Sequence, residues 1–318
     1  MLLNPPQNLP FLSAICWQID DIYRLLPKEM LQIYERNWRY CGILATPSTE
    51  EISFIKQLCH YYNSDLIINN LSMFKREFHR LILTVLSTFN AKYLLDYGAY
   101  FGGGTLFSLD YGEYRLSKDI DCICGVGEGY RQLRQQIYSL GYDALFSDTK
   151  EIELPQAIKS DQYGIRFPVL IKNTIIKIEI VAEGRIALEQ PEYPNWSPVP
   201  CLNFKDRIAE KLLANSDRWL DNSVKSRDLI DLAIARIHSP FPEEAFHKAE
   251  QAYPVIEPLK EAIINFQAKP EYREECFSIL QIDNPAQVIN GLDLLAQDFN
   301  FDTTERTFPE TNYDYLDN

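Results

Sequence analysis

Two aspartates, Asp119 and Asp121, have a spacing that could bind a metal ion. Residues 119–124 have the composition of a short strand, in which side chains alternate between two faces. Both carboxylates therefore lie on one face, with their Cα atoms roughly 6.5–7 Å apart. Like charges at that spacing repel each other unless a cation lies between them. The pair therefore predicts a site for Mg²⁺ or Mn²⁺, with phosphate oxygens and water as further ligands.

A glycine-rich turn precedes this pair in the chain. Residues 93–101 are rich in aromatic and aliphatic side chains and predict a strand, and residues 106–111 predict a short helix. Glycines between them let backbone N–H groups approach a phosphate, and a helix start favours an anion. A glycine triplet alone is weak evidence. Followed by two aspartates on one face, it predicts that Gly103, Gly104 and the hydroxyl of Thr105 bind a triphosphate.

A third carboxylate, Glu179, is the single acid in an apolar strand predicted over residues 175–181. An acid in such a setting is unfavourable unless it is paired or binds a ligand. Placed beside the aspartate strand, Glu179 would complete a metal site of three carboxylates. The alternative is a glutamate exposed on an edge strand.

Two helices predicted near residues 203–219 and 226–238 carry further charged candidates. Lys211 lies on the first helix and could neutralise triphosphate charge. Asp228 and Asp231 lie three residues apart on the second helix, on neighbouring positions of one face. Asp228 could position a base or the attacking hydroxyl. For each of these residues, a surface ion pair is an equally good explanation of the spacing.

Together these residues resemble the AbiEii/AbiGii toxin family of nucleotidyltransferases, within the DNA polymerase β-like superfamily. The family has a glycine pair and a threonine, followed by an Arg-x-Ser-x-Asp-x-Asp segment. Here these are Gly103, Gly104, Thr105, Arg115, Ser117, Asp119 and Asp121. The helical half of the family carries Ala-Glu-Lys and Arg-Asp-x-x-Asp-Leu. Here these are Ala209, Glu210, Lys211, Arg227, Asp228, Asp231 and Leu232. The resemblance covers about residues 72–240 and adds Arg115 and Ser117 to the nucleotide-binding residues.

The resemblance implies a metal-dependent transfer of a nucleotide from an NTP to an acceptor hydroxyl. It also implies a toxin of a toxin–antitoxin or phage-defence pair, with a cognate antitoxin as partner. Some relatives modify the 3′ end of tRNA, so RNA or protein is the expected acceptor. Two other functions remain open. The fold could be a catalytically idle module that senses nucleotides or binds a partner, or it could transfer AMP or a phosphoryl group to protein.

The expected fold is α+β, with a small mixed β-sheet nucleotidyltransferase core between helical segments. Residues 1–70 predict an N-terminal helical extension, 71–200 the core, 201–301 a C-terminal helical bundle and 302–318 a disordered acidic tail. Residues 167–172 and 175–181 predict a hairpin. The capping pattern of Ser48 with Glu51 predicts a helix start.

Composition excludes several other classes of protein. The formal net charge is −14, but residues 241–318 hold 5 Lys and Arg against 16 Asp and Glu, so the acidity is concentrated there. Residues 201–240 hold 7 Lys and Arg against 6 acids, which leaves room for a phosphate or RNA site. Four scattered histidines and seven cysteines without a CxxC pair argue against a zinc site or disulfides and favour the cytoplasm. The sequence has no apolar run long enough to span a membrane.

Overall fold

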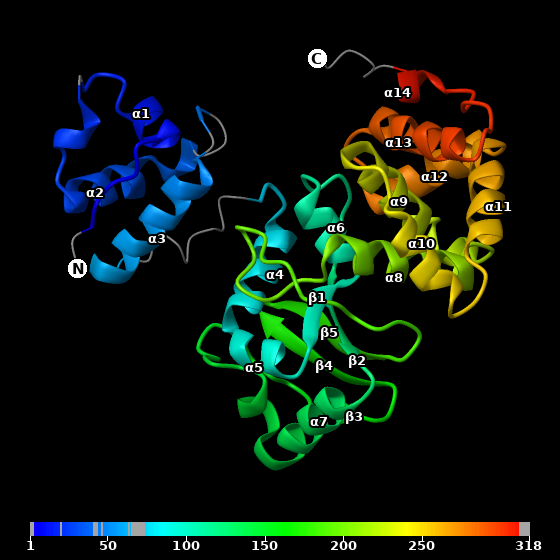
Figure 1. The fold of residues 1–318 in the computed structure, drawn as a ribbon, viewed down its shortest axis with the longest axis horizontal. Coiled ribbons are helices and arrows are strands. Elements are labelled where there is room, and N and C mark those ends of the chain that lie inside the picture. The colour runs from blue at the N-terminus through cyan, green and yellow to red at the C-terminus, as the bar shows by residue number, and fades with distance from the viewer. Residues whose placement is uncertain are drawn as a thin grey trace. The chain divides into compact units, whose positions relative to one another are not determined.

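The chain forms two compact units (Figure 1). The computed structural model describes residues 3–19, 21–40, 44–45, 47–62, 64 and 74–311. One unit comprises Met1–Ser87 and Pro194–Ser197, and the other comprises Thr88–Tyr193 and Pro198–Asn318. The boundaries predicted at residues 70, 200 and 301 stay a prediction. No helix within the described ranges is long and apolar enough to cross a membrane.

The first unit is helical, with a core of its own. It contains α1 (Pro10–Ile15), α2 (Pro27–Asn37), α3 (Thr49–Tyr62), the short turns η1 (Ile22–Arg24) and η2 (Trp38–Tyr40), and most of α4 (Glu77–Thr88). As predicted, the Ser48 hydroxyl accepts a hydrogen bond from the Glu51 backbone N–H at the start of α3 (3.1 Å). The side chain of Glu51 does not return to α3. It is fully buried and accepts hydrogen bonds from the backbone N–H groups of Phe11 (2.9 Å) and Leu12 (2.7 Å), so it stabilises the first turn of α1.

The second unit is built on a five-stranded mixed sheet in the order β1-β2-β5-β4-β3. The strands are β1 (Ala99–Gly102), β2 (Asp119–Gly125), β3 (Lys159–Ser160), β4 (Gly164–Ile171) and β5 (Thr174–Glu183). Only β2 and β5 pair in parallel, and the other neighbours are antiparallel. Helix α7 (Glu128–Leu140), followed by η4 (Gly141–Ala144), contacts β2. The predicted mixed sheet and α+β class are confirmed.

The hairpin is also confirmed. Its two-residue turn lies one residue earlier than the predicted bounds implied: Lys172 (φ 45°) and Asn173 (φ 64°) form it, and Ile171 pairs with Thr174. Two positive φ angles match the right-handed twist of the flanking strands.

The strand predicted over residues 93–101 is wrong over most of its length. The structure has helix α5 (Ala91–Asp96) there, and only Ala99–Gly102 forms a strand. The side chain of Asn90 accepts a hydrogen bond from the Tyr93 N–H (3.2 Å), which begins the helix. Gly98 has a φ of 65°, and this turn separates the helix from β1.

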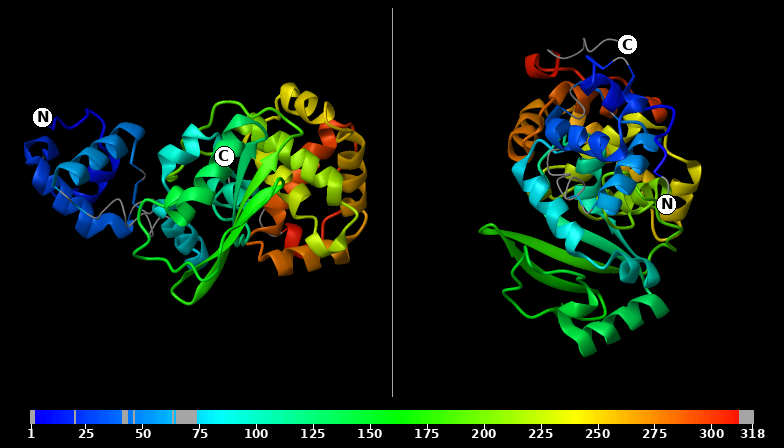
Figure 2. Two further views of the ribbon diagram at one scale, coloured as in Figure 1. Left: turned by 90° about the horizontal axis from the view of Figure 1, so that it is seen from below. Right: turned by 90° about the vertical axis from the view of Figure 1, so that its left-hand side faces the viewer.

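Helix α6 (Gly103–Asp110) connects the sheet to the C-terminal helices, because it contacts β1 and β2 as well as α8 and α9. Figure 2 shows those helices gathered into one bundle, in yellow-green to red. The bundle consists of α8 (Phe204–Arg218), η5 (Asn222–Val224), α9 (Arg227–His238), α10 (Glu243–Glu250), α11 (Ile256–Gln267), α12 (Pro270–Leu280), α13 (Pro285–Asp298) and α14 (Phe308–Thr311).

The acidic tail is partly ordered, contrary to our expectation. Residues 302–311 have defined positions, and Glu310 is fully buried. The guanidinium of Arg273, itself buried, donates to both carboxylate oxygens of Glu310 (2.8 and 3.0 Å). An acidic composition therefore conceals an ion pair that fixes α14 to the bundle. Residues 312–318 lie outside the described residues.

Candidate active site

A cavity of about 320 Å³ lies where the sheet meets α6, α8 and α9. Of the predicted site residues, those that line it are Asp119, Asp121, Glu179, Gly103, Gly104, Arg115, Ser117 and Lys211. The other two predicted residues, Thr105 and Asp228, are buried next to lining residues. The fold thus brings together residues that are up to 125 positions apart in the sequence, between Gly103 and Asp228.

The carboxylates on the sheet come from β2 and β5. Asp121 pairs in register with Glu179 on the neighbouring parallel strand. Burial, together with the charges of Asp119 and Glu179, raises the pKa of Asp121 to about 6. Within the described residues, neither Asp119 nor Asp121 has a side-chain hydrogen bond or ion pair to another residue. Glu179, by contrast, accepts a hydrogen bond from Arg166 Nε (2.6 Å).

Strand alternation places the two cysteines of β2 away from these acids, as predicted. Cys122 and Cys124 are fully buried, whereas Asp119 and Asp121 border the cavity. Burial raises the pKa of the Cys122 thiol, which makes it a poor nucleophile. The cysteines therefore belong to the core.

The glycine pair allows the acids of β2 to pack against the start of α6. Gly103 has a φ of 63°, and a Cβ there would overlap the carboxylate of Asp121. A Cβ at Gly104 would overlap the guanidinium of Arg115. The two glycines therefore have a packing reason in addition to the predicted contact with phosphate.

Thr105 and Ser117 join α6 to the start of β2. The hydroxyl of Thr105 donates to the backbone carbonyl of Asp119 (2.5 Å), and its oxygen lies 2.8 Å from Ser117 Oγ. Thr105 is only 1% exposed, so its hydroxyl positions the aspartate strand.

Helices α8 and α9, across the cavity from the sheet, carry a buried network of alternating charges. Arg115 donates to both carboxylate oxygens of Asp231 (2.6 and 2.8 Å), and Lys211 lies 2.8 Å from Asp231 and 3.0 Å from Asp228. Arg218 completes the network with two contacts to Asp228 (2.6 and 2.9 Å). Burial by itself would raise the pKa of Asp228, but the charges of Lys211 and Arg218 hold it well below its usual value. The ion pair considered as an alternative for Lys211 and Asp228 is therefore present, but it is buried and not at the surface.

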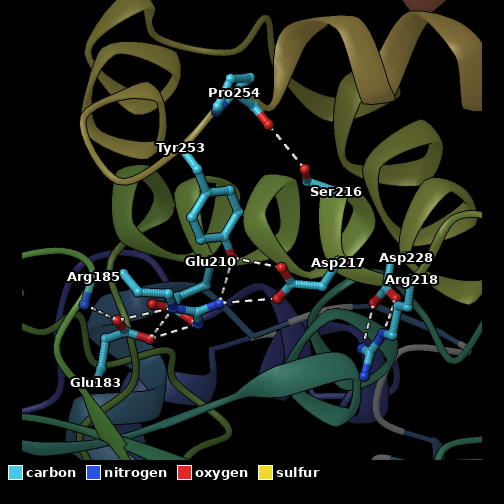
Figure 3. A network of polar contacts seen from close by, with 9 residues as sticks. All are labelled: Glu183, Arg185, Glu210, Ser216, Asp217, Arg218, Asp228, Tyr253 and Pro254. Atoms are coloured by element: carbon cyan, nitrogen blue, oxygen red, sulfur yellow. Dashed lines mark hydrogen bonds and ion pairs between the residues drawn. The ribbon is translucent and has the colours of Figure 1, made fainter.

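Arg185 forms a second network at the end of β5 (Figure 3), which the sequence did not reveal. Its guanidinium donates to Glu183 (2.6 Å), Glu210 (3.1 Å), Asp217 (3.2 Å) and the hydroxyl of Tyr253 (2.9 Å). Glu210 Oε1 is buried without a hydrogen-bond partner within the structure as described. Burial and the charge of Glu183 raise the pKa of Glu210 well above its usual value. Glu183 and Arg185 lie on either side of Gly184 and match no recognisable motif. The sequence therefore gave no signal for this network.

The residues of the sheet fit a divalent cation in part. Among the described residues, no three His, Cys, Asp or Glu side chains are already assembled as a metal site. Asp119 and Asp121 nevertheless form a donor set of two carboxylates that no cationic side chain neutralises through a direct contact. Mg²⁺ prefers one or two carboxylates with phosphate oxygens and water, so this donor set suits it. Glu179 would have to leave Arg166 to become a third ligand.

The sequence of residues 84–287 matches the family described as nucleotidyl transferase AbiEii toxin, type IV toxin–antitoxin system. No curated protein matches the chain. Two solved structures from Helicobacter pylori are similar at 21% identity and cover 67% of this chain. One is a proposed nucleotidyltransferase (TM-score 0.41, 89% of that chain covered), and the other is JHP933 (TM-score 0.39, 86% covered). Because the family match spans more than half of the sequence, the chain belongs to the AbiEii nucleotidyltransferases, the toxins of type IV toxin–antitoxin systems.

Proposed function

We propose that this nucleotidyltransferase uses Mg²⁺ or Mn²⁺, held by Asp119 and Asp121, to transfer a nucleotide from an NTP to an acceptor hydroxyl. One observation carries the proposal. The two aspartates face the cavity without a side-chain partner among the described residues, and the cationic residues Lys211 and Arg227 line the same cavity. Two carboxylates side by side repel each other unless a cation lies between them, and the cationic side chains across the cavity suit an anion such as a triphosphate.

The metal, when bound, would neutralise phosphate charge and orient the α-phosphate. Glu179 is the proposed third ligand. The turn at Gly103 and Gly104 would present backbone N–H groups to the triphosphate, and Lys211 would offset its charge. The acceptor oxygen forms a bond to the α-phosphorus as the bond to the β-phosphate oxygen breaks, so pyrophosphate leaves and the acceptor proton is released.

Several predicted residues are better suited to positioning than to contact with the substrate. Asp228 has a lowered pKa and binds Lys211 and Arg218, so it is a poor proton acceptor. We assign it the placement of Lys211. Arg115 and Ser117 line the cavity, but the guanidinium of Arg115 is held by Asp231. Ser117 is the more accessible of the two for a phosphate oxygen, and Thr105 supports it from behind.

Membership of the family implies an antitoxin as partner and an NTP as substrate. For the acceptor we propose an RNA hydroxyl, such as a tRNA 3′ end, or a protein side chain. We further propose that the protein acts in the cytoplasm, because its buried free thiols, Cys16, Cys59, Cys122, Cys124, Cys201 and Cys276, suit a reducing compartment.

The central test is the Asp121→Asn variant. Each of the four ribonucleoside triphosphates, labelled at the α-phosphate, is incubated with Mg²⁺ and with either total tRNA or the proteins of a host extract. We expect the variant to lose at least about 100-fold in pyrophosphate release and in label transfer, since charge stabilisation in active sites commonly contributes that much. Asp298→Asn, on α13 and outside the cavity, is the matched control.

Three results are decisive. Equal transfer by Asp121→Asn and the wild-type protein would show that the metal assignment is wrong. Binding of an NTP by the wild-type protein without release of pyrophosphate would instead support the idle nucleotide-sensing module. Mass spectrometry of the labelled product separates RNA from protein as acceptor and detects a transferred AMP. A transferred phosphoryl group comes from the unlabelled γ-position, so it is detected as added mass on the unlabelled acceptor.

A further inference from the structure

Six cationic side chains line the cavity, and they differ in whether a carboxylate already neutralises them. The six are Arg115, Arg185, Arg207, Lys211, Arg218 and Arg227. Five form ion pairs: Arg115 with Asp231, Arg185 with Glu183, Arg207 with Asp110, Lys211 with Asp228 and Asp231, and Arg218 with Asp228. Arg227 has no hydrogen bond and no ion pair with any residue that the structure describes.

The backbone fixes the position from which the Arg227 side chain extends. It is the first residue of α9 and follows Lys225 (φ 56°) and Ser226 (φ 50°), both in the left-handed region. Lys225 Nζ forms an ion pair with Glu275 Oε1 (2.6 Å), and the Ser226 hydroxyl donates a hydrogen bond to the hydroxyl of Tyr272 (3.2 Å). Two contacts to α12 thus hold the turn that leads into Arg227.

Arg227 is half-buried and shares the cavity with the unpaired acids of β2. A guanidinium can donate two parallel hydrogen bonds to a phosphate, and this geometry makes arginine a frequent phosphate ligand. The five paired cations have already given donors to protein carboxylates, whereas Arg227 donates to none of the residues that the structure describes.

We propose that Arg227 binds the triphosphate of the NTP and stabilises the pyrophosphate that leaves. This inference rests on the proposed function and adds to it a substrate-binding residue outside the acidic pair, the glycine turn and Lys211. The guanidinium donates hydrogen bonds to phosphate oxygens and takes no part in bond breaking or proton transfer. The ligand chemistry is that of a polyphosphate, so a nucleoside monophosphate gains little from Arg227.

The test compares binding rather than turnover. Titration calorimetry of the full chain with Mg²⁺ measures the dissociation constants of the four ribonucleoside triphosphates, their monophosphates and inorganic pyrophosphate. Arg227→Ala should weaken NTP and pyrophosphate binding roughly 10- to 100-fold, as expected for loss of a hydrogen-bonded charge. It should leave monophosphate binding within about twofold, because the polyphosphate is absent. Arg227→Lys should recover part of the loss.

Two controls separate binding from folding. Arg236→Ala removes an arginine of the same helix that pairs with Asp298 outside the cavity, and it should leave NTP binding unchanged. The urea midpoint of Arg227→Ala should equal that of the wild-type protein, since no described residue loses a partner. A lower midpoint would show a structural role and would overturn the proposal.

The inference and the proposed function fail in different ways. Equal NTP affinity of Arg227→Ala and wild type overturns the inference, even if the wild-type protein transfers nucleotide. It is also overturned if the variant loses affinity only for the RNA acceptor, or if the wild-type protein binds no NTP. Weaker NTP binding by Arg227→Ala supports the inference, even if the wild-type protein releases no pyrophosphate.

Discussion

The two sides of the cavity use the same residue type in opposite ways. On the sheet wall, the surface formed by β2 and β5, Asp119 and Asp121 have no protein partner in the part of the chain that is described. On the helix wall, the surface formed by α8 and α9, Asp228 and Asp231 each contact two cations. The carboxylates of the helix wall are thus part of the protein's own ion pairs, and the contrast supports the proposal that those of the sheet wall bind a metal ion.

The pKa values of the two walls follow this division. Asp121, Asp228 and Asp231 all lose solvation, which by itself raises a carboxyl pKa. Asp121 also has Asp119 and Glu179 as neighbours, and its pKa rises further, to about 6. Asp231 is fully buried, but the charges of Arg115 and Lys211 hold its pKa below the usual value. The neighbouring charges, rather than burial, therefore decide the direction of the shift.

The largest expected effect comes from breaking the helix wall. Asp231→Ala leaves Arg115 and Lys211 with one fewer buried partner, and removing one partner from such a network costs about 3–5 kcal/mol of unfolding free energy. Urea unfolding, followed by circular dichroism, measures the loss. Asp298→Ala, which removes the half-exposed partner of Arg236, should cost below about 1 kcal/mol. Similar losses in the two variants would contradict a structural role for the helix wall.

The sheet wall was largely predictable from the sequence, and the helix wall was not. Alternation along β2 is a local property, so it placed Asp119 and Asp121 on one face and Cys122 in the core without knowledge of the fold. The pairing of Arg115 with Asp231 joins residues 116 positions apart and depends on how α6, α8 and α9 pack. No spacing within one element reports such a contact.

The same limit explains one incomplete prediction and one error elsewhere in the chain. Glu51 had the right spacing for a capping box, but it binds the backbone of Phe11, 40 positions away. Glu310 lies in an acidic tail whose composition indicated disorder, but it forms a buried ion pair with Arg273, 37 positions away. In both cases a distant donor outweighs the local pattern, because a buried carboxylate requires hydrogen bonds wherever the fold supplies them.

A smaller change in the unfolding free energy, and one that stabilises the protein, is expected from a substitution on the sheet wall. Without metal, ionised Asp121 destabilises the folded state, so Asp121→Asn should raise the unfolding free energy by about 1–3 kcal/mol at pH 8. Folded Asp121 takes up a proton near pH 6, before the unfolded chain does near 3.8. The wild-type protein therefore recovers stability as pH falls, and the advantage of the variant should vanish near pH 4. Urea midpoints in EDTA across this range test it, with Asp298→Asn expected to show no such pH dependence.

The smallest expected effect on stability is that of replacing Glu210. This residue lies on α8, in the helix wall, but its raised pKa resembles that of Asp121 on the sheet wall. Its Oε1 has no hydrogen-bond partner within the described chain, and its pKa is raised by burial and by Glu183. Folded Glu210 keeps its proton above the pH at which the unfolded chain releases it, so wild-type stability declines as pH rises through the raised pKa. Glu210→Gln is neutral at every pH and should show a shallower decline, with a gain of at most about 1 kcal/mol at neutral pH, measured by urea unfolding.

Glu210→Gln therefore decides how general the comparison between the two walls is. If the variant is destabilised as strongly as Asp231→Ala, the contact of Glu210 with Arg185 is structural, and every acid of the helix wall is part of the scaffold. If its stability is unchanged or higher, the division follows the partners of each acid rather than the element that carries it. Since Arg185 is already satisfied by Glu183, Asp217 and Tyr253, we expect the second result.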